Sequence, residues 1–307
     1  YTAGGSSGGA GAAVGAGLLP IAPGSDGAGS IRIPAALNGL FGHKPSRGRV
    51  PNPADKLDRY KMTTMGPLAR SVDDAAALLD VLVGRNPHQA GSFLAAARAG
   101  TPRLRIGLIV DAPIVDTDTE AAAAARDAAA TLADAGHHVA DATPRHASLD
   151  AFLPIYQRLL AAIPVASERR LQPVTRWFRA EGRRHPRREV DAAFAELSAL
   201  AASAIDGFDV IITPTIPVLP PRVGEHTGLA PADYFRALAG LGAFTAASNL
   251  TGAPAATVPW SVSRQGTPLG VQIVARPGED ERVLALSREL EQARGRPSGL
   301  SPRAVGA

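Results

Sequence analysis

Residues 24–34 read Gly-Ser-Asp-Gly-Ala-Gly-Ser-Ile-Arg-Ile-Pro, and residues 4–9 read Gly-Gly-Ser-Ser-Gly-Gly. Both stretches combine serine hydroxyls with glycine, whose missing side chain lets a backbone or a substrate approach closely. Acyl transfer needs a nucleophile beside backbone N–H groups, because those groups stabilise the developing oxyanion. Gly27, Ala28 and Gly29 before Ser30 supply such a backbone, and a helix that begins at Ser30 would add the positive end of its dipole. The pattern therefore predicts an acyl-transfer site centred on a serine.

The base that would activate this serine is not evident from the sequence. A serine hydroxyl is a weak nucleophile, so a second group must take its proton. Of the seven histidines, only His43 lies near the serine segments, but members of a catalytic triad need not be sequence neighbours, so a Ser-His-Asp site stays open. Residues 5–9 also satisfy the Gly-x-Ser-x-Gly pattern of a nucleophile elbow. That motif follows an apolar strand, which residues 1–3 are too short and too small to form.

The composition narrows the classes of protein. The 307 residues contain no cysteine, which excludes disulfides, thiolate zinc sites and a cysteine nucleophile. No histidine or carboxylate cluster has metal-ligand spacing, and no apolar run reaches the ~18 residues of a membrane span, so we predict neither a metal nor a membrane partner. The net charge is only +4, and the densest basic cluster, residues 183–188, lacks interleaved aromatic residues. We therefore predict no nucleic-acid partner.

Strand and helix patterns alternate along the chain and predict an α/β fold. Ser71 with Asp74, and Thr117 with Glu120, have the spacing of N-terminal capping boxes, and the acidic pair 73–74 is expected to cap a helix. We expect strands over residues 18–22, 103–110, 138–140, 208–212, 255–258 and 269–274. We expect helices over residues 9–17, from Ser30, over 67–83 opened by Ser71, and over 117–135, 191–205 and 279–293. The strand-helix-strand order of 103–140 is typical of parallel strands, and the whole favours a mixed sheet covered by helices.

Several segments, in order, resemble the amidase signature family. The most specific block covers residues 3–51 and contains GGSSGG, GSDGAGSIRIP and GHKPSRGRV. Later segments that agree are MGPLARS at 65–71, DVIITPT at 209–215, NLTGAPA at 249–255 and GVQ at 270–272. The similarity spans nearly the whole chain. It implies an α/β/α sandwich with a mixed central sheet covered by helices, and an amidase that hydrolyses a carbon–nitrogen (amide) bond without a cofactor.

The resemblance also implies a Ser-cis-Ser-Lys triad that works through an acyl-enzyme. Ser30 matches the nucleophile, and Ser6 matches the cis-serine that relays the proton. Gly27, Ala28 and Gly29 match the oxyanion-hole segment, with Ala28 in place of a common glycine. The expected partner is a small-molecule amide bound by a cytoplasmic enzyme, and a homodimer is a possible assembly.

The chain departs from the family pattern at the base. The family's lysine lies well upstream of the GGSSGG loop, and this chain begins three residues before that loop. The resemblance therefore implies a single amidase domain over residues 1–307 that lacks its N-terminal portion. Lys44 matches a different family lysine. One alternative is the amidase subunit of the tRNA-dependent amidotransferase, which typically has glutamine where Ile33 stands. Another is a non-catalytic remnant or a partial sequence.

Other polar and aromatic residues have a structural explanation. We expect Ser7 to be a loop hydroxyl without a catalytic role. Asp26 and Arg32 are expected to form a buried ion pair, or hydrogen bonds, that lock the loop before Ser30. Trp177 and Phe178 either line a substrate pocket or pack against other side chains, and the sequence leaves both roles open.

Overall fold

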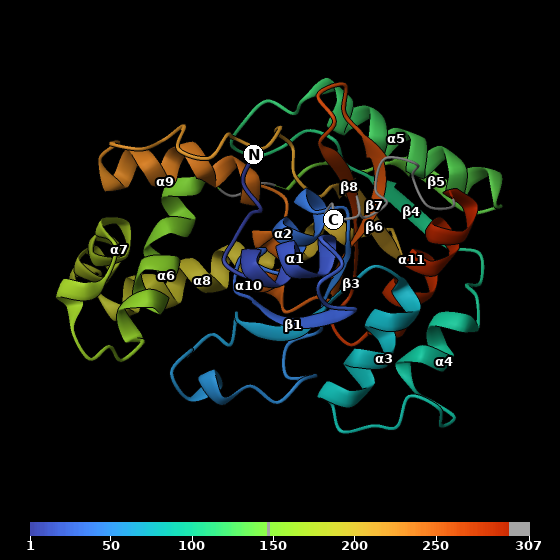
Figure 1. Ribbon diagram of the computed structural model, residues 1–307, viewed down its shortest axis with the longest axis horizontal. Coiled ribbons are helices and arrows are strands. Elements are labelled where there is room, and N and C mark those ends of the chain that lie inside the picture. The colour runs from blue at the N-terminus through green and yellow to red at the C-terminus, as the bar shows by residue number, and fades with distance from the viewer. Residues whose placement is uncertain (146–147, 295–307) are drawn as a thin grey trace.

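The computed structural model describes residues 1–145 and 148–294, which Figure 1 shows arranged around one central sheet. The described sheet has eight strands in the order β1-β3-β2-β7-β8-β6-β4-β5. Its strands are β1 (Ile21–Asp26), β2 (Phe41–Lys44), β3 (Thr64–Ala69), β4 (Arg105–Leu108), β5 (His138–Asp141), β6 (Val210–Pro214), β7 (Ala255–Val262) and β8 (Pro268–Ala275). Strand β4 lies parallel to β5 and β6, and the other neighbouring pairs are antiparallel. The expected mixed sheet is confirmed.

Helices cover both faces of this sheet. The described α-helices are α1 (Gly8–Gly15), α2 (Arg32–Leu37), α3 (Val72–Leu82), α4 (Phe93–Arg98), α5 (Thr119–Asp134), α6 (Leu149–Ala162), α7 (Pro173–Arg184), α8 (Arg187–Ala202), α9 (Pro231–Ala239), α10 (Ala246–Thr251) and α11 (Asp280–Arg294). Helices α3, α5 and α11 pack on one face. Helix α2 packs against β2, β7 and β8 from the other face. This is the expected α/β/α sandwich.

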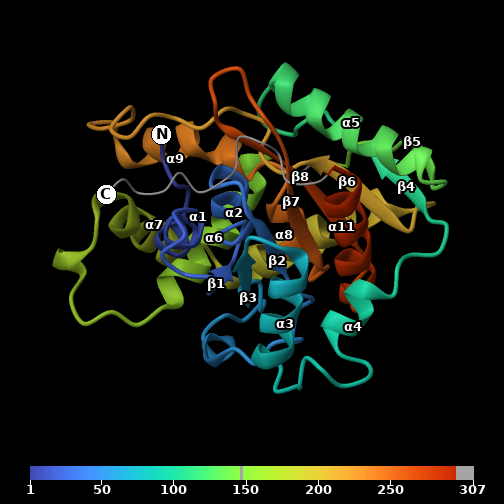
Figure 2. The same ribbon diagram turned by 45° about the vertical axis from the view of Figure 1, so that its right-hand side comes forward.

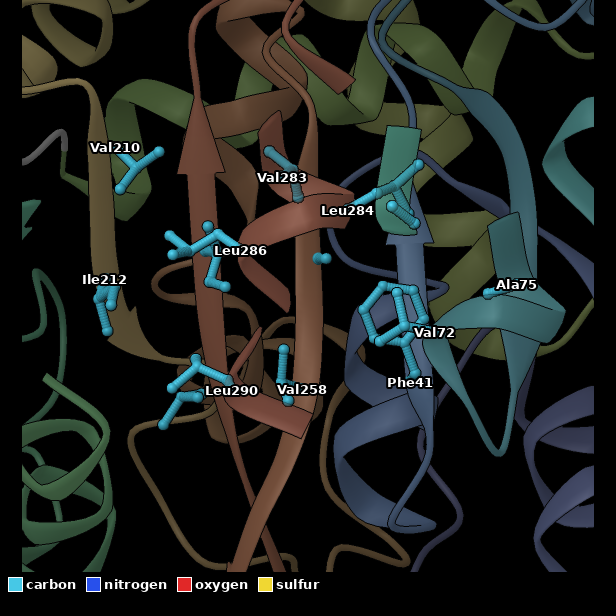
Figure 3. Close-up of a cluster of buried hydrophobic side chains, with 14 of the residues drawn as sticks. Phe41, Val72, Ala75, Val210, Ile212, Val258, Val283, Leu284, Leu286 and Leu290 are labelled. Carbon is cyan, nitrogen blue, oxygen red and sulfur yellow. The ribbon is translucent and has the colours of Figure 1, made fainter. Parts of the chain in front are cut away.

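The main core lies between the sheet and the layer of α3, α5 and α11. Alternate residues of a strand point to opposite faces, and Ala256, Val258 and Trp260 of β7 all belong to this core. Figure 3 shows strand side chains such as Phe41 and Val258 gathered with those of α3 and α11. Burial of these apolar side chains stabilises the sheet and fixes its register.

The opposite face of the sheet carries residues without bulky side chains where α2 lies. A Cβ atom on Gly42 would lie 2.6 Å from the Cβ atom of Ala35 in α2, and one on Gly270 would lie 3.2 Å from the Cβ atom of Ala36. These distances are too short for an ordinary contact, so glycine is required at Gly42. The small residues let α2 approach the sheet closely, and they place the segment that precedes α2 at the end of β1.

Several local predictions agree with the structure. The Ser71 hydroxyl accepts the N–H of Asp74 at 3.1 Å at the start of α3. Strands β4 and β5 are parallel and are joined by α5. The N-cap of α5, however, is Asp118, whose carboxylate accepts the N–H of Glu120 at 2.8 Å. The predicted capping residue, Thr117, was therefore wrong by one position.

Other boundaries differ from the predictions. The strand expected over 18–22 runs from Ile21 to Asp26, so it begins and ends later in the chain than predicted. Helix α2 begins at Arg32 and not at Ser30. Strands β2 and β3, and helices α4, α6, α7, α9 and α10, were not predicted. The helical interpretation of 67–83 concealed β3, which pairs with both β1 and β2.

Helices α6, α7 and α9 form a lobe beside the sheet, which Figures 1 and 2 show from two sides. Within this lobe α7 contacts both α6 and α9. Gly182 of α7 lies against the backbone carbonyl of Gln157 in α6, so a Cβ atom there would overlap that carbonyl. Close packing of α6 on α7 therefore depends on a glycine.

Gly182→Ala is expected to lower the free energy of unfolding by roughly 1–3 kcal/mol, because the added methyl group overpacks the helix contact. Gly9→Ala in α1 is the matched control, since a Cβ atom there meets nothing within 4 Å. Alanine favours a helix over glycine by ~1 kcal/mol, so the control should be neutral or stabilising. Urea-unfolding midpoints measure both variants, and equal midpoints would contradict the close contact.

Candidate active site

The loop between β1 and α2 is organised around the buried carboxylate of Asp26. The N–H of Gly29 donates to its Oδ1 at 2.7 Å, and the N–H of Ile31 donates to its Oδ2 at 3.2 Å. Gly29 has φ 122°, a conformation that favours glycine, and a Cβ atom there would run into Thr245. The carboxylate and the glycine therefore hold residues 27–31 in one turn. The helix α2 begins directly after this turn, at Arg32.

Arg32, the first residue of α2, pairs with this carboxylate. Its Nε and Nη2 donate to the two oxygens of Asp26 at 2.9 and 2.8 Å, and both side chains are 0% exposed. Burial opposes ionisation of Asp26, but the Arg32 guanidinium lowers the pKa of its carboxyl to about 2. Arg32 also donates to the backbone oxygen of Thr245 (2.8 Å) and to side-chain oxygens of Ser248, Gln272 and Asn249 (2.7 Å each). The expected buried ion pair is confirmed.

Lys44, at the end of β2, is a second buried cation near this pair. Its side chain is 0% exposed, and its Nζ donates to the backbone oxygen of Pro45 at 2.9 Å. Burial, together with repulsion from Arg32, lowers the pKa of Lys44 to about 7. The lysine does not line the cavity that holds the serines. This geometry fits a structural role for Lys44.

Ser6 and Ser30 line the same cavity, which has a volume of about 460 Å³. The peptide bond between Gly5 and Ser6 is cis. The N–H of Ser7 donates to the backbone oxygen of Ser30 at 3.2 Å, so the two serine loops lie against each other. Ser6 is exposed and Ser30 is half-buried. The structure thus brings together the two serines that the sequence singled out.

The predicted oxyanion-hole segment only partly faces this cavity. Ala28 lines it, whereas Gly27 and Gly29 are not among its described lining residues. Within residues 1–145 and 148–294, the N–H groups of Ala28 and Ser30 donate to no acceptor. The carbonyl of Ala28 accepts the hydroxyl of Thr245 at 2.6 Å, which fixes this peptide. Two free N–H groups beside a serine are what an oxyanion would need.

Three alternatives that the sequence left open lose support: Ser7 as a second nucleophile, the nucleophile elbow, and His43 as the catalytic base. The hydroxyl of Ser7 exchanges two hydrogen bonds of 3.2 Å with the backbone of Ser25, as expected of a loop hydroxyl. Residues 1–4 form no strand, so the nucleophile elbow lacks the strand that it requires. His43 is fully buried, with its Nε2 3.2 Å from Asp280, and it does not line the cavity.

Sequence reasoning missed Thr245 and most of the aromatic side of the cavity. No motif marked Thr245, which binds the loop only through the tertiary fold. Phe178 lines the cavity, and the ring of Trp177 packs against it with centroids 5.0 Å apart. Phe152 and Phe235 also line it. Aromatic residues make up only 5% of the chain, so their concentration near 152–156, 177–178 and 234–235 was the available signal.

The described residues contain neither a candidate metal site nor a candidate membrane span. No group of three or more His, Asp or Glu side chains there could hold a metal ion. No helix there is long and apolar enough to cross a bilayer. The sequence-based predictions about cofactors, nucleic acid, localisation and assembly stay predictions.

The family model named Amidase matches residues 1–284. The chain belongs to the amidase signature family. Its relatives include the Mycobacterium tuberculosis protein named AmiB2, which is 39% identical over 303 residues, covering 95% of this chain and 65% of AmiB2. The 6-aminohexanoate-cyclic-dimer hydrolase of Paenarthrobacter ureafaciens is 37% identical over 329 residues, covering 94% of this chain and 66% of that enzyme. This amidase signature chain thus spans about two thirds of the length of these relatives.

Solved structures of amidase signature enzymes have the same fold as this chain. A 6-aminohexanoate cyclic dimer hydrolase complexed with substrate superposes with a TM-score of 0.83 at 32% identity, covering 97% of this chain and 70% of that one. A bacterial aryl acylamidase of the family superposes with a TM-score of 0.82 at 26% identity, covering 99% of this chain and 68% of that one. The resemblance that the sequence motifs indicated is confirmed.

The low pKa of Lys44 predicts pH-dependent stability. An unfolded lysine has a pKa of ~10.4, whereas Lys44 in the folded protein has a pKa of about 7. The unfolded chain therefore binds more protons between these values, and the free energy of unfolding is expected to rise from about pH 7 to about pH 9. Lys44→Met should flatten this slope, as measured by urea unfolding across that range. Lys56→Met, at an exposed position, should keep the parental slope, and an unchanged slope in Lys44→Met would contradict the assignment.

Proposed function

We propose that this chain carries the nucleophilic part of an amidase that hydrolyses a small-molecule amide through an acyl-enzyme on Ser30. The observation that carries this proposal is the placement of Ser30, Ser6 and Ala28 on one cavity. These residues stand at the motif positions of the family to which the chain belongs. Relatives named as an amidase and as a 6-aminohexanoate-cyclic-dimer hydrolase support a hydrolase that acts on amides.

In the proposed reaction, the Ser30 oxygen bonds to the carbonyl carbon of the amide while Ser6 passes the Ser30 proton toward a base. The carbonyl oxygen becomes an oxyanion, which accepts hydrogen bonds from the N–H groups of Ala28 and Ser30 within the segment 27–30. Collapse of this intermediate breaks the carbon–nitrogen bond, and the amine leaves with the proton returned through Ser6. Water then attacks the acyl-enzyme, releases the acid and restores the Ser30 hydroxyl. No step requires a cofactor.

We infer that the base is a lysine outside these 307 residues. Lys44 is buried and donates to a backbone oxygen, and neither Lys56 nor Lys61 lines the cavity. A lysine can act as a base when burial lowers its pKa, because burial disfavours the ammonium form. AmiB2, of which this chain covers 65%, is long enough to carry such a residue beyond the matched region.

Ser30→Ala is expected to reduce amide turnover at least ~10³-fold, because the nucleophile is removed. Ser6→Ala should reduce it by roughly 10²- to 10³-fold through loss of proton relay. Release of aniline from a simple anilide measures both, in the 307-residue chain and in the product of the reading frame extended upstream of Tyr1. The matched control is Ser7→Ala, because the Ser7 hydroxyl binds only the backbone of Ser25 among the described residues. Its amide turnover should stay within about tenfold of that of the parent. Undiminished turnover in Ser30→Ala would rule out the proposed mechanism.

A further inference from the structure

One wall of the serine cavity is built from aromatic rings of the α6, α7 and α9 lobe. The rings of Tyr156 and Phe178 meet edge to face with centroids 5.5 Å apart, and those of Phe178 and Phe235 do so at 4.9 Å. Phe152 stacks on Tyr156 at 6.0 Å. All four residues line the cavity with Ser6 and Ser30. Each ring is held by another, which gives a wall of fixed shape.

Charge is nearly absent from this cavity. Arg145 is the one charged side chain among its described lining residues, and Arg145 is exposed. The described lining residues include no carboxylate that could pair with an ammonium group, and Arg145, the one possible partner for a carboxylate, is exposed to solvent. Burial of a charged group against the aromatic wall is therefore unfavourable. An uncharged apolar group carries no such penalty, and its transfer from water into the cavity is favourable.

The wall offers the hydroxyl of Tyr156 as a hydrogen-bond donor, beside that of Tyr234. The hydroxyl of Tyr156 has no hydrogen-bond partner among the described residues, although the residue lines the cavity. Burial, with a contribution from the charge of Asp26, raises the pKa of the Tyr156 phenol. The phenol therefore stays protonated and can donate to a neutral acceptor such as a carbonyl oxygen.

A second cavity, of about 580 Å³, is mainly apolar and adjoins the first. The two cavities share the lining residues Arg145, Ala201, Ala243, Ala247 and Leu250. Neither Ser6 nor Ser30 lines it. Phe194 of α8 does line it and stacks on Tyr60 with ring centroids 4.3 Å apart. An apolar compound could enter either space, so a test must separate the two cavities.

We propose that the substrate of this site is an amide with an uncharged, apolar acyl group, aryl or extended alkyl, bound against the rings of Tyr156, Phe178 and Phe235. The cavity volume of about 460 Å³ falls within the ~300–1,000 Å³ of small-molecule sites. The proposal rests on the amidase function proposed above for Ser30. It concerns binding, however, and binding does not require the Ser30 hydroxyl.

The experiment measures equilibrium binding of four amides by calorimetry, using the 307-residue Ser30→Ala chain so that no turnover occurs. The probes are acetamide, hexanamide, phenylacetamide and succinamate. Each buried methylene strengthens binding roughly fourfold, so hexanamide should bind on the order of 100-fold tighter than acetamide. Phenylacetamide should also bind more tightly than acetamide, and the charged succinamate should bind no better than acetamide. Equal affinities for acetamide and hexanamide, or a preference for succinamate, would overturn the proposal.

Two phenylalanine variants locate the bound probe. Phe235 is half-buried on α9, and no residue of that helix is fully buried, so Phe235→Ala leaves the main core intact. It should weaken hexanamide binding roughly tenfold with little effect on acetamide. Phe235→Leu, which keeps apolar bulk, should give an intermediate loss. Phe194→Ala is the matched control and should leave the hexanamide affinity unchanged.

Loss of hexanamide binding in Phe194→Ala but not in Phe235→Ala would place the compound in the second cavity and overturn the assignment. Failure of the two proposals can be told apart. Undiminished turnover in Ser30→Ala with the expected series of affinities removes the catalytic role of Ser30 and leaves the apolar site. Loss of turnover in Ser30→Ala with equal affinities for acetamide and hexanamide keeps Ser30 as the nucleophile and rejects the apolar acyl group.

Discussion

The candidate site depends on the buried ion pair between Asp26 and Arg32. Charges in a dry interior destabilise a protein unless every donor and acceptor is used, and here the partners of the pair come from β1, α2, α10 and β8. The carboxylate of Asp26 also takes the N–H groups of Gly29 and Ile31. The conformation of residues 27–31 is therefore set by the assembled fold. The carboxylate binds the neighbours of Ala28 and Ser30, whose own N–H groups donate to no acceptor in the described part of the chain.

The sheet must let α2 come close for this pair to form. Gly42 and Gly270 leave room on the face of the sheet where Ala35 and Ala36 of α2 lie, and larger residues there would move Arg32 away from its partners. Lys44 adds a second cation to the same interior, and its lowered pKa is the consequence of burial beside Arg32. The ion pair that holds the loop therefore depends on the close packing of α2 against the sheet.

The serines, the ion pair and the class of fold could be predicted because their signals are local and dense in residues 4–9 and 24–34. The start of α2 could not, since the turn of residues 27–31 before it is held by contacts with Asp26 and Thr245 that depend on the tertiary fold. Strand β2 is buried at all four positions, so it shows no alternation of polar and apolar residues. Helix α7 carries many arginines, but Arg179 is buried and binds the carbonyls of Leu160 and Ile163 at 2.7 and 2.6 Å. A solvated basic face and a packed helix look alike in sequence when arginine caps a neighbouring helix.

The cavity lies between two parts of the fold that are anchored separately. Its reactive side is the β1–α2 loop, which is bound into the sheet by Arg32 and cannot change without loss of buried hydrogen bonds. Its aromatic side belongs to the lobe of α6, α7 and α9, where Gly182 and Arg179 fasten α7 to α6. No residue of the ion-pair network lies in that lobe. Substitutions at Phe178 or Phe235 can therefore reshape the aromatic wall while the backbone around Ser30 stays in place. Under the proposed function, this arrangement would separate the choice of substrate from the chemistry performed on it.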